Sequence, residues 1–134
     1  MKSLLFLALF FFIWPFSSGG KTYHMSASNM VPAASGTVEA KTDHHNVNLD
    51  IKVSNLAKPA NLVPAASVYL VWVRPQGEAA IKKGSIHIGD DLDGEVKVVT
   101  TSKNFEVMIT AEKSVTATAP MGPDVLRTHV KLEG

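Results

Sequence analysis

Apolar and polar residues alternate along most of this chain, and this period of two restricts the folds that the chain can adopt more than any other feature does. The clearest case is residues 47–53, where valine, leucine and isoleucine alternate with asparagine, aspartate and lysine. Successive side chains of a β-strand point to opposite faces, so the pattern predicts a strand with one buried face. Residues 37–42 alternate in the same way, and the short polar turn between the two segments predicts a β-hairpin.

Six further segments have the composition of short strands, which brings the expected number to about seven or eight. They are residues 22–27, 67–73, 85–88, 95–100, 104–111 and 124–132. No helical stripe of useful length accompanies them. Two longer connections that contain proline, 54–66 and 113–123, suit crossings between layers. We therefore predict an all-β, immunoglobulin-like two-sheet sandwich of antiparallel strands that forms a single domain over residues 21–134.

The first twenty residues differ sharply from the rest of the chain. Lys2 is their only charge, residues 4–16 are almost entirely apolar, and four small residues follow. This is the three-part pattern of a secretory signal peptide, and the apolar run is shorter than the roughly 20 residues of a spanning helix. We expect residues 1–20 to be cleaved and the domain to be exported, periplasmic or extracellular, without a stable membrane anchor.

The predicted mature domain, residues 21–134, is electrically balanced and lacks recognisable catalytic motifs. Without Lys2, the 13 basic residues become 12, against 12 acidic ones, which argues against a nucleic-acid partner. The chain has no cysteine, so an exported domain of this size depends on apolar burial instead of disulfides. Nucleophile elbows, phosphate loops and paired metalloprotease histidines are all missing from the sequence. We expect a protein that is not an enzyme and needs no cofactor.

Residues 67–73 stand out because they are apolar on both faces. Their β-branched and aromatic composition predicts a central strand that ends at Pro75, since proline cannot continue the ladder of hydrogen bonds. We expect Leu70 and Trp72 to fill the core, which turns the alternate side chains outward. The predicted interaction face is Tyr69, Val71 and Val73. Either the connection 54–66 covers this apolar row, or a protein partner or second copy of the chain binds there.

Histidine and methionine support a second hypothesis. His44 and His45 are adjacent in a polar turn, and His24 precedes one of the four methionines of the mature domain. Imidazole and thioether groups are ligands that suit copper. The alternative function is therefore a periplasmic carrier for a copper-type metal, with His24, His44 and His45 as candidate ligands.

The second half of the chain carries motifs in a recognisable order. These are Val68-Tyr69-Leu70-Val71-Trp72-Val73, Lys83-Gly84-Ser85-Ile86, Asp93-Gly94, Phe105 to Glu112, and Ala119 to Leu126. The series resembles the extracytoplasmic C-terminal domain of bacterial anti-sigma-K-type regulators over roughly residues 68–126. This resemblance implies an immunoglobulin-like or related sandwich and a bacterial source.

The resemblance also frames the expected function. The regulators carry a cytoplasmic sigma-binding segment and a membrane helix ahead of this domain, whereas the present chain has a signal-like segment there. It also lacks their usual glycine pair before Pro120. We therefore expect a stand-alone exported domain that acts through protein–protein interaction, with envelope sensing or assembly as the process that the resemblance suggests.

Overall fold

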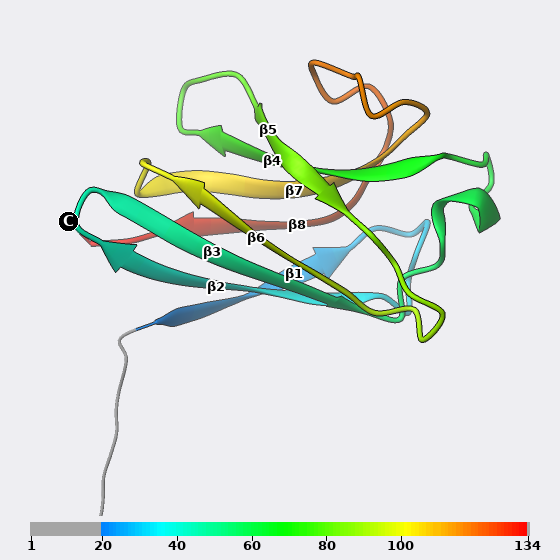
Figure 1. The fold of residues 1–134 in the computed structure, drawn as a ribbon, viewed down its shortest axis with the longest axis horizontal. Coiled ribbons are helices and arrows are strands. Elements are labelled where there is room, and N and C mark those ends of the chain that lie inside the picture. Colours follow the sequence, from blue (N-terminus) through cyan, green and yellow to red (C-terminus); the bar gives the residue numbers. More distant parts are fainter. Residues whose placement is uncertain (1–19, 134) are drawn as a thin grey trace, which may run out of the picture.

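The computed structural model describes residues 20–133, which form eight β-strands with antiparallel neighbours throughout (Figure 1). The strands are β1 (Lys21–Ala27), β2 (Ser35–Asp43), β3 (Asn46–Ser54), β4 (Val68–Pro75), β5 (Ile81–Ile86), β6 (Gly94–Thr100), β7 (Asn104–Glu112) and β8 (Asp124–Lys131). The helical content of this range is a single 3-10 turn, η2 (Pro59–Asn61). The all-β architecture with seven to eight antiparallel strands is confirmed.

The predicted signal peptide, residues 1–20, lies outside the described residues except for Gly20. Over the range that the structure describes, no helix reaches the length and hydropathy that crossing a bilayer requires.

The strands form one nearly closed sheet with the order β5-β4-β7-β8-β1-β2-β3-β6. Strand β1 joins its two halves, because residues 21–25 pair with β2 whereas Ser26 and Ala27 pair with β8. The sheet therefore folds over on itself, so that β6, β3, β2 and β1 form one layer and β5, β4, β7 and β8 the other (Figure 1). Strands β5 and β6 are the two ends of this order.

The main core fills the space between the layers, and local alternation predicts most of it correctly. In the β2–β3 hairpin, the apolar side chains point inward and are buried: Val38, Ala40, Val47, Leu49, Ile51 and Val53. The inward face of β7 is also as expected: Phe105, Val107, Ile109 and Ala111. A period of two is decisive here because each strand carries polar residues on its other face.

Strand β4 is oriented opposite to the expectation. The side chains of Tyr69, Val71 and Val73 are 0% exposed and belong to the main core, so the predicted interaction face is wrong. The pairing of β4 with β7 explains this, because Val71 lies opposite Ile109, which points inward. Residues 67–73 are apolar on both faces, so alternation alone cannot decide which face is buried between the layers.

Tyr69 closes one end of the core beneath the β3–β4 connection, residues 55–67. Its hydroxyl donates a hydrogen bond of 2.5 Å to the carbonyl oxygen of Ala57. Leu56 and Leu62 of the same connection are buried in the main core. Burial raises the pKa of the Tyr69 hydroxyl to about 12.

We expect the domain to lose stability between about pH 10 and pH 12 because of Tyr69. The folded state keeps this proton up to a pKa of about 12, whereas an unfolded tyrosine releases it near pH 10. The unfolded state then binds fewer protons, so the free energy of unfolding falls by at most about 1.4 kcal/mol per pH unit. Denaturant titrations of wild type and Tyr69→Phe over this range should show a shallower decline in the variant. Equal slopes would contradict the assignment.

Candidate functional site

The connection between β7 and β8 is far longer than its topology requires. These strands are adjacent and antiparallel, and two residues are enough to join such a pair. The chain instead uses residues 113–123, which we call the strap. The strap rises from the end of β7 and passes over the outer face of the layer that contains β4 and β5 (orange in Figure 1).

The strap covers an apolar cluster that is separate from the main core. Leu70, Trp72 and Met108 form this outer cluster, and Ala80 and Ala117 pack against it. The expectation that Leu70 and Trp72 lie between the two sheets is therefore wrong, although both side chains are 0% exposed. They are buried because the strap folds over the outside of the sheet. This is a long-range contact, which a local sequence pattern does not predict.

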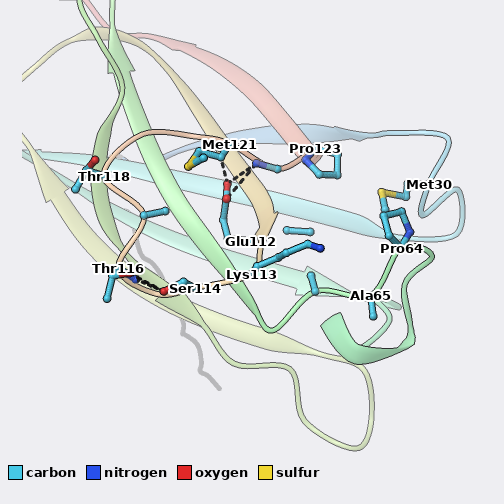
Figure 2. A pocket seen from close by; sticks show the side chains of 14 residues that line it. Met30, Pro64, Ala65, Glu112, Lys113, Ser114, Thr116, Thr118, Met121 and Pro123 are labelled. Atoms are coloured by element: carbon cyan, nitrogen blue, oxygen red, sulfur yellow. Dashed lines mark hydrogen bonds between the residues drawn. The ribbon is translucent and has the colours of Figure 1, made fainter.

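Glu112 holds the end of the strap against β7. Its side chain is almost completely buried, and Figure 2 shows the carboxylate pointing at the backbone beside Met121. The Gly122 N–H donates to Oε1 and Oε2 at 3.0 and 3.1 Å, and the Met121 N–H donates to Oε2 at 3.2 Å. The Thr110 hydroxyl adds a bond of 2.6 Å to Oε2. Buried charge is tolerated when hydrogen bonds of this kind satisfy it.

The direction of these hydrogen bonds fits an ionised Glu112. The indole N–H of Trp72 can only donate, and it does so to the Thr110 hydroxyl at 2.7 Å. The hydroxyl proton of Thr110 is therefore left for Glu112, whose other partners are backbone N–H donors. A carboxylate that only accepts matches this set. The chain of bonds links Trp72 under the strap to the strap's own backbone.

Gly122 is the residue that lets the strap approach so closely. A Cβ atom at this position would lie 1.8 Å from the carbonyl oxygen of Ala111, so a side chain cannot be accommodated without moving backbone. The amide of Ala111 also donates to the carbonyl oxygen of Pro123 at 2.9 Å. Residues 121–123 are therefore packed tightly onto β7.

Lys82 of β5 holds the middle of the strap from the opposite side. Its Nζ donates to the carbonyl oxygens of Val115 and Ala117 at 2.6 and 2.8 Å, and the lysine is exposed. Ser114 organises the turn itself, because its Oγ accepts from the Thr116 N–H at 3.1 Å. The strap is thus tied by a buried anion at one end and an exposed cation at its middle.

A pocket of about 620 Å³ opens beside the strap. The strap forms one wall, and Pro64 to Ala66 of the β3–β4 connection and Met30 of the β1–β2 connection form the other (Figure 2). Most of its lining is small and apolar, and the Glu112 carboxylate is already engaged by the strap. The volume is in the range of pockets that bind small molecules or side chains of a partner.

Exposed apolar side chains occur in the two connections that form this pocket. The three most exposed large hydrophobic side chains of the described residues are Val63 (90%), Met121 (83%) and Val115 (56%). All three belong to the two connections that wall the pocket. An apolar hollow with an apolar rim suits the binding of an apolar group. Because Glu112 accepts hydrogen bonds from the strap, its role is to hold this wall of the pocket in place.

The structure does not bring the candidate metal ligands together. His24 lies opposite Thr37 in the β1–β2 pairing, whereas His44 and His45 form the β2–β3 turn. Seven residues of strand, or roughly 23 Å, separate these positions. The Nδ1 atom of His44 is 2.9 Å from the Asp43 carboxylate. Within residues 20–133, no group of three or more histidine, aspartate or glutamate side chains is arranged to hold a metal ion.

Sequence reasoning missed Glu112 and the strap as parts of a site. One signal was present, because a connection of this length between neighbouring strands asks for a role beyond the turn. That the two strands it joins, β7 and β8, are neighbours in the sheet is known only from the fold, however. No protein-family model, no curated protein and no solved structure matches the chain, so the interpretation of this site rests on its own geometry.

Proposed function

We propose that this protein is an exported, non-enzymatic β-sandwich that binds an apolar segment of a partner protein in the pocket beside the strap. The observation that carries the proposal is an apolar pocket that Met121 lines with an exposed side chain, together with exposed Val63 and Val115, which directly adjoin lining residues in the sequence. Scattered surface hydrophobes are ordinary, whereas a contiguous group around a hollow is typical of an interaction site. This proposal moves the interaction site from the outer face expected for β4 to the connections at one end of the sandwich.

The wider setting follows from the sequence. The signal-like segment supports export, and the resemblance of residues 68–126 to the extracytoplasmic domain of anti-sigma-K-type regulators supports a role in envelope sensing or assembly. We propose this role for the domain alone, because the sigma-binding segment of those regulators has no counterpart in the resemblance.

Site-specific photo-crosslinking in the host cell tests the binding proposal. A photoreactive residue at Met121 or Val63 is expected to form a defined protein adduct, since Met121 lines the pocket and Val63 is an exposed residue next to Pro64, which also lines it. The same residue at Val99, a half-exposed valine on β6, is the control. Adding Met121→Gln, which is polar and uncharged beside Glu112, should abolish the Val63 adduct while changing the free energy of unfolding by no more than about 0.5 kcal/mol. Equal adducts at Val63 and Val99, or none at either rim position, would refute the proposed site.

Intact-mass analysis of the exported protein tests the proposed location. We expect a mature chain that begins at Gly20 or Lys21, because small residues occupy the positions that a signal peptidase prefers before either cut. A full-length chain recovered from the membrane fraction would contradict both cleavage and release.

A further inference from the structure

We propose that the strap is a gate for the pocket, in which residues 114–120 swing outward while residues 121–123 stay fixed to β7. This movement would open the outer cluster to the pocket. As a means of regulating a partner, the gate rests on the proposed function, but the movement itself does not depend on it.

The fixed end follows from burial. Residues 121–123 are held by a carboxylate that is 2% exposed and by a glycine whose site has no space for a Cβ atom. Releasing them would remove the Met121 and Gly122 N–H donors from a buried carboxylate and leave it only the Thr110 hydroxyl, which is costly. The adjoining bond between Ala111 and Pro123 continues the pairing of β7 with β8. This end therefore opens only when the domain unfolds.

The mobile part follows from the opposite condition. Residues 114–116 and 118–120 are exposed, and only Ala117 is partly buried. The side chain that ties this part to the sheet is Lys82, which is itself exposed to water. Water can replace hydrogen bonds at such a position, so the net cost of breaking them is modest, and most of the cost of opening comes from exposing Leu70 and Trp72. Exposed bonds and few apolar contacts mark segments that open locally.

Ala117 connects the two apolar regions. It lines the pocket on one side and packs against the outer cluster on the other. Moving residues 114–120 away removes this shared wall, so that the pocket extends over Leu70 and Trp72. The closed strap thus hides apolar surface, and the apolar segment that we propose as ligand would gain contact area when the gate opens.

Native-state thiol labelling can detect the gate without any partner. The chain has no cysteine, so a single introduced cysteine is a unique reporter. Leu70→Cys places the thiol under the strap, and Val71→Cys places it one residue away in the main core. Global stability of each variant is measured in parallel. We expect Leu70→Cys to react at least about tenfold faster than its own global unfolding allows, and Val71→Cys only through global unfolding.

The clamp is then tested by removing Lys82. Lys82→Met in the Leu70→Cys background should accelerate labelling about tenfold, because it removes both hydrogen bonds from the ammonium group to the strap, at an exposed position where their net contribution is modest. Lys83→Met is the matched control, because the neighbouring lysine makes no hydrogen bond to the strap in the described structure. Hydrogen exchange of the Trp72 indole N–H, measured by NMR, should respond in the same order without a cysteine.

The outcomes separate the two proposals. Labelling of Leu70→Cys that merely tracks global unfolding, or equal effects of Lys82→Met and Lys83→Met, overturns the gate. Crosslinking at Met121 would still stand in that case. Conversely, rapid labelling with no rim adduct supports the gate and removes the proposed partner site.

Discussion

Replacing Val71 by lysine is expected to lower the free energy of unfolding by about 4–5 kcal/mol at pH 7, a large part of the roughly 5–15 kcal/mol that stabilises a typical domain. Val71 is fully buried between the two layers, where a charged amine has no partner. The least costly solution is to bury the amine uncharged. A lysine has an ordinary pKa of about 10.4, so removing its proton at pH 7 costs about 1.4 kcal/mol for each pH unit between 7 and 10.4. This cost accounts for the expected loss of stability.

Chemical denaturation of the variant at several pH values measures the effect. Because the folded state holds fewer protons than the unfolded state, stability should recover by about 1.4 kcal/mol per unit as the pH rises toward 10. Val71→Met controls for side-chain size, and Val99→Lys places the same charge on an exposed valine. Val99→Lys should remain close to wild type, whereas Val71→Met should lose about 1–3 kcal/mol from overpacking, with no dependence on pH. A Val71→Lys variant as stable as Val99→Lys would show that Val71 faces outward, as the sequence predicted.

Replacing Trp72 by alanine is expected to destabilise the domain by about 3–5 kcal/mol, as for other large side chains removed from well-packed sites. Trp72 is completely buried, and its indole N–H donates to Thr110. The loss of packing should be confined to the strap side of the sheet, since the main core does not contain this residue. Cleavage by trypsin after Lys113, at the start of the strap, should therefore become faster than in wild type.

A more conservative change separates packing from hydrogen bonding at the same position. Trp72→Phe keeps an aromatic ring but removes the donor to Thr110, so we expect a loss of about 1–2 kcal/mol. Equilibrium unfolding of both variants gives the comparison. A loss below about 1 kcal/mol for Trp72→Ala would mean that the outer cluster contributes little, contrary to the close packing of buried side chains.

The parts of the fold that the sequence predicts well are those decided by neighbouring residues. The β2–β3 hairpin combines two alternating strands with a turn of two residues, His44 and His45, between paired ends at Asp43 and Asn46. His44 adopts a φ of 59°, a conformation that short polar turns tolerate. Nothing distant is needed to specify this unit.

The orientation of β4 required information from elsewhere in the chain. The inward face of β7 is correctly predicted, but the register that places Val71 opposite Ile109 joins positions 38 residues apart, 109 minus 71. A strand that is apolar on both faces gains from burial either way. Its orientation is therefore set by its partner strand and by the strap, neither of which a period of two describes.

The candidate site was the least predictable part. Glu112 ends a strand whose outward residues include Glu106, so alternation treats it as another solvated charge. The strap's serine, threonine, alanine and proline indicate only a loop. Strand β5 shows a similar limit, because it begins at Ile81 and not at residue 85. Lys82 and Lys83 look unlike a strand, although lysines are common on edge strands, where they discourage aggregation.

The double pairing of β1 affects the order in which the chain can fold. Ribosomes and export channels release a protein from its N-terminus, so β1 emerges first and β8 last. Ser26 pairs with Arg127 and Ala27 with Leu126, which joins the beginning of the domain to its end. Contacts between such distant positions slow folding because a long loop must close first. Until its final strand emerges, the chain cannot complete its sheet.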